Sequence, residues 1–179
     1  IYRAHFAFIK NPRINSKGLN TSAIFGFCNS LLEVTNKFDP SHIGVVFDPP
    51  GGSDREGVFA DYKANRQEMP EDIRKAIPHI FDLLKAMNIK VEMEEGFEAD
   101  DVIGTLAKQA EKKGFETYMM TPDKDFGQLV SDHIFIYKPG RSGNPSEILG
   151  PKEVCEKFEV KDPLQVIDIL GLWGDAVDN

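Results

Sequence analysis

The sequence predicts an α/β domain with a mainly parallel sheet, and three observations support that fold class. Strand-like and helix-like segments alternate along the chain, which is the pattern of parallel strands joined by helices. The chain has 179 residues, of which 41% are hydrophobic, so it can build one sizeable core in a single domain. Acidic residues stand at the predicted strand ends, where α/β folds place their functional groups.

The first predicted elements are a helix and a short strand. Asn20 or Thr21 can cap a helix that runs to about Thr35. Its apolar side chains recur at helical spacing, at Ile24, Phe25, Cys28, Leu31 and Leu32. Residues 42–47 have the pattern of a short buried strand, and the Pro-Pro-Gly-Gly stretch after Asp48 excludes regular structure.

A charged segment separates these elements from the next helix and strand. Residues 55–69 are polar, and a helix is predicted to follow Pro70. The apolar stripe of that helix is Ile73, Ile77, Ile80, Phe81 and Leu84. Pro78 is expected to kink the helix, because proline removes a backbone donor and clashes with the preceding turn. Residues 89–93 are predicted to form the second strand.

The clearest helix of the sequence is predicted over residues 99–113. Its apolar residues recur on one face, and Gly114 is a suitable C-terminal stop. Two further strands are predicted over residues 116–121 and 133–137. The alternation of strands and helices therefore continues into the second half of the chain.

The last part of the chain is predicted to hold a loop and two closing helices. The loop covers residues 138–150, and the helices begin at Pro151 and Pro163, because proline suits the first helical turn. The side chains of the last helix that are expected to face the core are Leu164, Ile167, Leu170 and Trp173.

The charge and the composition narrow the class of protein. The formal net charge is −8, which argues against a protein that grips nucleic acid only through a basic surface. Divalent ions bound by the acidic residues would cancel part of this negative charge locally. The net charge therefore argues less strongly against a metal-dependent nuclease. The apolar runs are far shorter than the roughly 20 residues of a membrane span, and no signal peptide is visible.

The cysteines and histidines are expected to have structural roles. Cys28 and Cys155 are too few and too far apart to indicate a disulfide scaffold or a zinc site, so both should be reduced thiols of a cytoplasmic protein. The scattered histidines are His5, His42, His79 and His133. No Ser-His-Asp arrangement is visible, so no protein nucleophile is expected.

Eight carboxylates stand at strand or helix ends on four separate segments. They are Asp48, Glu98, Asp100, Asp101, Asp123, Asp125, Asp175 and Asp178. A magnesium-like ion prefers oxygen ligands and is held by a few carboxylates and water, and two such ions roughly 4 Å apart can drive a phosphoryl displacement. Each acid alone also fits a cap, a turn, a partner of the helix dipole or a solvated tail, but the whole set favours a metal site.

A basic pair stands in the charged segment. Lys63 and Arg66 are three residues apart, so on a helix they share a face and together offer a point charge and a bidentate fork to one phosphate. Tyr62 is suited to stack on a nearby base. The alternative interpretation is a solvated, charged loop.

Five segments together resemble a known family. They are VVFD at residues 45–48, DYKANR at 61–66, GFEADDVI at 96–103, TPDKD at 121–125 and GDAVDN at 174–179. Their order and approximate spacing resemble the 5′-nuclease (5′→3′ exonuclease) domain of bacterial DNA polymerase I, which is related to flap endonucleases of the PIN-like superfamily. The resemblance covers essentially the whole chain, and its most specific signals are the Glu-Ala-Asp-Asp and Asp-Lys-Asp stretches.

The resemblance implies a fold, an activity and partners. The fold would be a PIN-like three-layer domain, with a mainly parallel central sheet flanked by helices. The activity would be metal-dependent hydrolysis of DNA at or near 5′ ends and 5′ flaps, in DNA repair and primer removal, with two Mg²⁺ or Mn²⁺ ions. The partner would be DNA with a 5′ end or flap, and the protein would be a monomeric, cytoplasmic, nucleoid-associated bacterial enzyme with a polymerase region downstream.

The resemblance also assigns roles to residues by motif. The first metal cluster would be Asp48, Glu98, Asp100 and Asp101. The residues that place or tune the second ion would be Asp123, Asp125, Asp175 and Asp178. Catalysis would depend on Asp101 and Asp123 and on the basic pair Lys63 and Arg66 beside the scissile phosphate. Residues 61–85 would form an arch for the 5′ strand, and Arg3 would contact a further phosphate.

Two departures from the family pattern are expected to lower activity. The family has one more metal-binding Asp before its Tyr-Arg pair, and this chain begins too late, at Ile1, to contain it. The family also continues past its Asp-Asn pair into a helix–hairpin–helix-like element that grips duplex DNA. We therefore expect residues 1–179 to be a catalytic core that is truncated at both ends, with reduced metal affinity, weak DNA binding and little activity.

Two other functions fit parts of the pattern. A PIN-like ribonuclease would share the acidic cluster but would not need Lys63. A receiver-like, non-catalytic regulatory domain would hold phosphate or metal in an acidic pocket, although it needs fewer acids than this chain offers. Comparing the cleavage of DNA flaps with that of single-stranded RNA distinguishes the DNA nuclease from the ribonuclease. Reaction with a small phosphodonor distinguishes it from the receiver-like domain, because only the latter should form a stable aspartyl phosphate.

Overall fold

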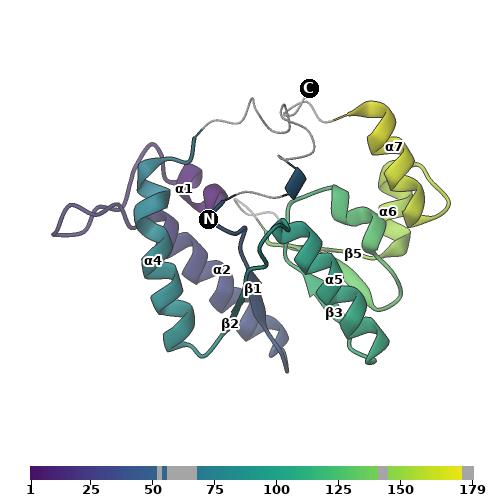
Figure 1. Ribbon diagram of the computed structural model, residues 1–179, viewed down its shortest axis with the longest axis horizontal. Helices are drawn as coiled ribbons and strands as arrows, with labels where there is room; N and C mark the ends of the chain where they lie inside the picture. Colours follow the sequence, from purple (N-terminus) through teal and green to yellow (C-terminus); the bar gives the residue numbers. More distant parts are fainter. Residues whose placement is uncertain (52–53, 56–67, 141–144, 175–179) are drawn as a thin grey trace. The chain divides into compact units, whose positions relative to one another are not determined.

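The computed structural model describes residues 1–51, 54–55, 68–140 and 145–174 (Figure 1). The chain divides into two compact units. The first unit consists of Ile1–Val45 and Gln67–Glu92, and the second consists of Val46–Arg66 and Met93–Asn179. Among the described residues, no helix combines the length and the apolar character that a bilayer span requires.

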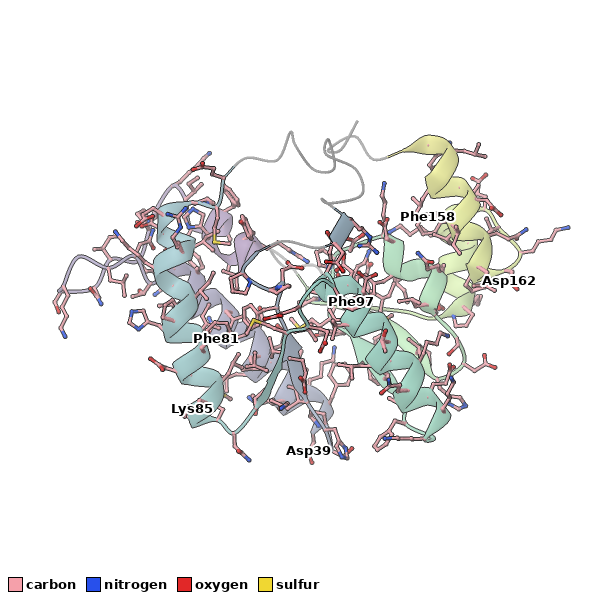
Figure 2. All side chains as sticks on the ribbon, viewed as in Figure 1. Asp39, Phe81, Lys85, Phe97, Phe158 and Asp162 are labelled. Carbon is pink, nitrogen blue, oxygen red and sulfur yellow. The ribbon has the colours of Figure 1, made fainter. Side chains whose placement is uncertain are left out.

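The first unit is built around helix α2. Its described elements are α1 (Tyr2–Ala7), α2 (Ser22–Phe38), α4 (Glu71–Ala86), β2 (Lys90–Glu92) and most of β1 (Gly44–Val46). α2 contacts both α1 and α4, and β1 pairs with β2 in a two-stranded sheet. α2 runs a turn further than predicted and ends where Asp39, labelled in Figure 2, takes a left-handed conformation before Pro40.

Helix α4 confirms the apolar stripe that its sequence predicts. Ile73, Ile80 and Leu84 are each 0% exposed, and the helix continues from Glu71 to Ala86 with Pro78 inside it. The amide of Asn20 donates a 2.8 Å hydrogen bond to Asp72 in the first turn of α4. This bond ties the loop before α2 to the helix that lines the opposite side of the same unit.

Helix α1 and the loop after it were not predicted as ordered elements. α1 has only six residues, too few to be stable alone, so its packing on α2 must supply the stability. In the loop, the guanidinium carbon of Arg13 lies 3.9 Å from the centre of the Phe25 ring and 5.2 Å from that of Phe8. Gly26 marks the closest approach of the two helices, because a Cβ atom there would lie 2.5 Å from the Cβ of Ala4.

Replacing Gly26 with alanine is expected to destabilise the protein by about 1–3 kcal/mol, because the added methyl overlaps Ala4. The matched control is Gly171→Ala in the last helix, where no atom lies within 4 Å of the added carbon. There the helix propensity of alanine should stabilise the protein by about 0.5–1 kcal/mol. Urea unfolding of both variants checks the pair, and equal stability of the two would contradict the close contact.

The second unit contains a three-stranded sheet covered by helices. Its strands are β3 (Thr117–Met119), β4 (Ile134–Lys138) and β5 (Glu147–Leu149), in the order β3-β4-β5. β3 and β4 are parallel, with Thr117 opposite Ile134, whereas β5 is antiparallel to β4. Its described helices are α5 (Ala99–Lys112), the 3₁₀ turn η1 (Asp125–Leu129), α6 (Pro151–Phe158), the 3₁₀ turn η2 (Pro163–Gln165) and α7 (Val166–Trp173).

The core of the second unit lies between the sheet and these helices. Its buried residues are Ala107, Met119, Phe126, Val130, Ile134, Ile136, Val154 and Val166. Phe158, labelled in Figure 2, packs against the core from the end of α6. The α5 face that periodicity predicts is therefore inward, with Ile103 and Ala107 in contact with this cluster.

Two predictions for the second unit were wrong. Residues 147–149, placed in a loop, form β5, because they pair with the free edge of β4. In the last helix, Leu164, Ile167 and Trp173 are 61%, 49% and 77% exposed, so they do not face the core as expected. Val166 is fully buried instead. The helix is apolar on most of its faces and follows a 3₁₀ turn of different pitch, so the sequence pattern does not select the buried face.

Candidate metal centre

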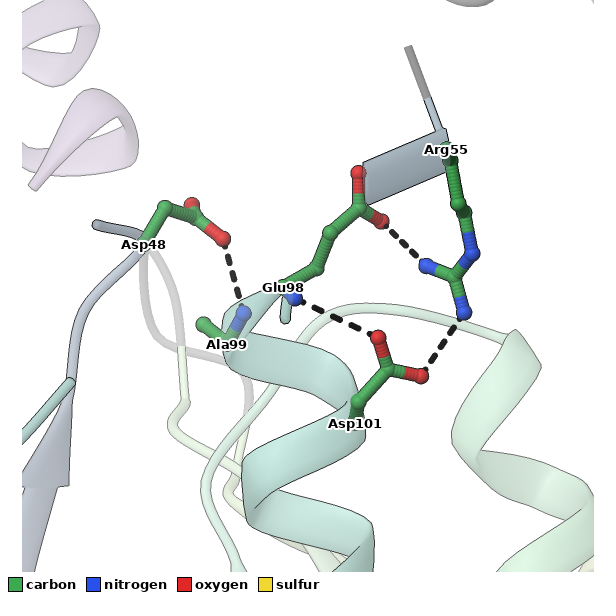
Figure 3. A network of polar contacts seen from close by, with 5 residues as sticks. All are labelled: Asp48, Arg55, Glu98, Ala99 and Asp101. Carbon is green, nitrogen blue, oxygen red and sulfur yellow. Dashed lines mark hydrogen bonds and ion pairs between the residues drawn. The ribbon is translucent and has the colours of Figure 1, made fainter. Parts of the chain in front are cut away.

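The start of helix α5 collects three of the predicted carboxylates within the second unit. Asp48 follows β1 by two residues, and its Oδ1 atom accepts a 2.8 Å hydrogen bond from the backbone N–H of Ala99 (Figure 3). That N–H belongs to the first turn of α5 and has no partner inside the helix. The segment after β1 is thereby joined to the N-terminus of α5, where Glu98 and Asp101 stand.

Glu98 and Asp101 are fixed by the helix that they begin. Glu98 is the N-cap residue of α5, and its backbone N–H donates a 3.2 Å hydrogen bond to Oδ2 of Asp101. The exposed fractions of the two side chains are 12% and 34%, respectively. The positive end of the helix dipole favours carboxylates at these positions, so their charges are partly compensated by the backbone.

Arg55 bridges these two acids. Its Nη1 atom lies 2.7 Å from Oε2 of Glu98, and its Nη2 atom lies 2.8 Å from Oδ1 of Asp101 (Figure 3). The guanidinium of Arg55 thus lies between the carboxylates of Glu98 and Asp101. Beside this pair lies a shallow pocket of about 380 Å³, lined by Asp54, Arg55, Gly96, Phe97, Asp101 and Thr105.

A backbone contact holds Arg55 close to α5. The N–H of Asp54 donates a 3.0 Å hydrogen bond to the carbonyl oxygen of Gly96. Gly96 has φ +82°, and a Cβ atom there would lie 2.8 Å from Oδ2 of Asp54. The positive φ favours glycine at this position, and a larger residue would also have to push the Asp54 carboxylate aside. Arg55 therefore starts from a defined point next to the acids that it binds.

Asp123 and Asp125 follow β3, as the sequence predicts: Asp123 lies in the turn after the strand, and Asp125 is the first residue of η1. The backbone N–H of Asp123 donates to Oγ1 of Thr121 at 3.1 Å, and Oδ1 of Asp123 accepts from the N–H of Asp125 at 2.9 Å. The Asp123 side chain therefore also supports the turn that opens η1. This role uses Oδ1 of Asp123, so Oδ2 can still bind a metal ion.

The structure describes only part of the predicted site. Asp48, Glu98 and Asp101 form one hydrogen-bonded network, and Asp100 is exposed in the first turn of α5. Within the described residues, no three His, Cys, Asp or Glu side chains converge closely enough to hold an ion. Arg3 lies in α1 of the first unit. The predicted site residues that lie outside the described residues are Tyr62, Lys63, Arg66, Asp175 and Asp178.

The predicted arch also falls partly outside the described residues. Its later part, residues 71–85, is the regular helix α4, whose buried stripe packs within the first unit. Residues 61–67 are not described. The arch therefore remains an expectation for the segment before α4.

The side chains present at the start of α5 fit a hard divalent cation. Every candidate donor is a carboxylate oxygen, which is the ligand type that Mg²⁺ and Mn²⁺ prefer. Glu98 and Asp101 already direct one oxygen each at a positively charged group, that of Arg55. The donor chemistry of these acids and the direction of two of them toward one cationic group are therefore suitable for a cation.

Sequence reasoning missed Arg55 and its supporting contacts. Arg55 was grouped with the polar segment of residues 55–69 and received no role. Its partners Glu98 and Asp101 are 43 and 46 residues away in the sequence, so no local pattern could have indicated the bridge. The glycine at position 96 was the available signal, because an isolated glycine before a helix often marks a close backbone approach.

Comparison with known sequences identifies the family. The family model of the 5′-3′ exonuclease N-terminal, resolvase-like domain matches residues 1–159. The 5′-3′ exonuclease of Aquifex aeolicus is 39% identical over 179 residues, which are 100% of this chain and 60% of that protein. DNA polymerase I of Bacillus subtilis is 40% identical over 179 residues, or 99% of this chain and 20% of the polymerase. The chain thus spans about three fifths of one relative and a fifth of the other.

Solved structures show the same fold. The 5′-exonuclease of bacteriophage T5, solved with bound zinc ions, has a TM-score of 0.70 and 18% identity over 99% of this chain and 64% of its own. The T5 flap endonuclease, solved as a pseudo-enzyme-product complex with DNA and metal ions, has a TM-score of 0.67 and 18% identity over 98% of this chain and 66% of its own. The predicted α/β, PIN-like fold is confirmed. With the family match over residues 1–159, the chain belongs to the family of 5′-3′ exonuclease N-terminal, resolvase-like domains.

Proposed function

We propose that this chain is the catalytic core of a divalent-metal-dependent nuclease that hydrolyses DNA at or near 5′ ends and 5′ flaps. The observation that carries the proposal is the network at the start of α5, where Arg55 bridges Glu98 and Asp101 and Asp48 binds the backbone N–H of Ala99. The family match and the relatives named 5′-3′ exonuclease and DNA polymerase I support the same reaction. The biological setting is DNA repair and primer removal.

The proposed roles follow the sequence motifs that resemble the family. The ligands of the first ion are Asp48, Glu98, Asp100 and Asp101. The residues that place the second ion are Asp123, Asp125, Asp175 and Asp178. When bound, the ions supply an activated water and offset charge on the leaving oxygen. The T5 structures with bound metal ions support a metal cofactor, and we propose that two Mg²⁺ or Mn²⁺ ions are used.

Substrate binding is proposed for the basic residues. Lys63 and Arg66 hold the scissile phosphate, and Tyr62 stacks on a neighbouring base. Arg3 contacts a further phosphate, and the segment from residue 61 to the start of α4 forms the arch beside which the 5′ strand passes. The complex of the T5 flap endonuclease with DNA supports a DNA substrate for this fold.

The proposed setting is a longer, monomeric bacterial protein. The chain matches only 20% of DNA polymerase I of Bacillus subtilis, which supports fusion to a polymerase region. We place the whole protein in the cytoplasm, at the nucleoid, where its DNA substrate lies.

A cleavage assay tests the function. The protein, extended at both ends to the length of the Aquifex relative, is incubated with a 5′-labelled flap DNA in Mg²⁺ or in EDTA. We expect cleavage near the flap junction that needs Mg²⁺ and is abolished by EDTA, because the acids cannot activate water without the ions.

Two outcomes would contradict this function. Faster cleavage of single-stranded RNA than of flap DNA would favour a PIN-like ribonuclease. A stable aspartyl phosphate after incubation with a small phosphodonor, without DNA cleavage, would favour a receiver-like regulatory domain.

A further inference from the structure

Arg55 is the described cation at the candidate metal centre, and neither the family motifs nor the proposed function assigns it a role. We propose that Arg55 is an internal counter-ion that holds Glu98 and Asp101 in the absence of metal and competes with a divalent ion for their oxygens. The inference rests on the proposed metal site. It concerns the affinity of that site rather than the chemistry of cleavage.

Arg55 and a bound cation would compete for the same carboxylate, that of Asp101. One carboxylate oxygen, Oδ1, accepts from Arg55, and the other, Oδ2, accepts from the backbone N–H of Glu98. Both oxygens of this side chain are therefore engaged. An ion that binds Asp101 directly comes next to the guanidinium at Oδ1, which it repels, or next to the N–H of Glu98 at Oδ2, whose hydrogen bond it weakens. Displacing the guanidinium leaves the helix intact, so it is the easier of the two changes.

The charges explain why a counter-ion is needed when no metal is bound. Glu98 and Asp101 are three residues apart at the start of one helix, so their like charges lie on the same face. Asp48 adds a third carboxylate through its bond to the N–H of Ala99. The guanidinium relieves this repulsion with one nitrogen for each acid, at 2.7 and 2.8 Å. The helix dipole compensates a further part of the same charge.

The exposure of Arg55 explains why a divalent ion can displace it. The Arg55 side chain is 48% exposed, so water solvates the guanidinium well and each ion pair contributes little to stability. A divalent ion carries twice the charge and is smaller, so it interacts more strongly with the same oxygens. Asp54 stays attached to Gly96 through the backbone, so Arg55 can swing away without detaching its segment.

The test is the affinity for Mn²⁺, measured by calorimetry on the full 179-residue chain with the native residue and with Arg55→Gln. Glutamine removes the positive charge and the pair of guanidinium nitrogens that bind the two acids, but it keeps a polar side chain. We expect Mn²⁺ to bind on the order of fivefold more tightly to Arg55→Gln, which corresponds to the loss of two exposed ion pairs. The control is Arg74→Gln, which removes an equal charge from an exposed pair with Glu71 on α4 and should leave the affinity unchanged.

Thermal unfolding supplies a second readout. In EDTA, Arg55→Gln should unfold at a lower temperature than the native chain, because Glu98 and Asp101 then repel each other without a counter-ion. The rise in unfolding temperature on adding Mn²⁺ should be larger for the variant. If Arg55→Gln does not fold, Arg55→Lys replaces it. A single ammonium keeps the charge but cannot reproduce the fork, so it should give an intermediate affinity.

The possible failures are distinguishable. If the native chain binds Mn²⁺ and the Arg55 variants bind it equally or more weakly, the counter-ion inference is overturned and the metal site stands. If neither the native chain nor any variant binds Mn²⁺, the proposed metal site is overturned together with the inference. Loss of binding in Asp101→Asn, with tighter binding in Arg55→Gln, supports both.

Discussion

Replacing Asp101 with asparagine is expected to reduce Mg²⁺-dependent cleavage of a 5′-flap DNA by more than about a hundredfold. Residues that only orient a metal ligand already change metal affinity or activity by about 10–100-fold, so a direct ligand should have a larger effect. Asparagine has nearly the same shape, and its oxygen can still accept the hydrogen bond from the N–H of Glu98. The variant should therefore fold, and circular dichroism checks that it does.

The control for this prediction is Asp168→Asn. Asp168 is an exposed aspartate in the first turn of α7, so the substitution makes the same change of charge at the start of another helix. Its cleavage rate should match that of the native protein. If Asp101→Asn also cleaved at the native rate, the proposed metal centre at the start of α5 would be wrong.

Replacing Ile134 with alanine is expected to lower the free energy of unfolding by about 2–5 kcal/mol. Ile134 is 0% exposed in β4, and it belongs to the buried cluster of the second unit. Removing its outer carbons leaves a cavity that the surrounding strands and helices can only partly fill, and the cost combines lost burial with that cavity. Urea unfolding monitored by circular dichroism measures the change.

Ile148→Ala is the matched control for Ile134. Ile148 lies in β5 of the same sheet, but it is 41% exposed, so the same substitution removes little buried area. It should cost less than about 1 kcal/mol. Equal losses at the two positions would mean that the sheet is not packed as described.

The main elements of the fold could be predicted because their patterns are local. Helices α2, α4 and α5 show apolar residues at helical spacing, and Pro or Gly stands near their ends. Strands β1 to β4 were also predicted; the first three were too long by one or two residues at each end, and β4 was shifted by one residue. The longer patterns place the centre of an element well, whereas its ends depend on hydrogen bonds to neighbouring elements.

The elements that were missed or misoriented depend on neighbours. α1 and β5 are six and three residues long, so each is stable only through a partner, α2 for the helix and β4 for the strand. The buried face of α7 depends on the 3₁₀ turn before it, and nearly all its faces are apolar. No short window of sequence contains that information.

The sequence by itself determined the fold class, the kinds of residue available to the metal centre and their places at strand and helix ends. Local periodicity and the order of motifs were sufficient for this. Only the tertiary structure decided what these acids contact, because Asp48 binds the N–H of Ala99 across 51 residues and Arg55 binds Asp101 across 46. Such contacts depend on the path of the chain through the fold, and a bridging cation has no periodic pattern of its own.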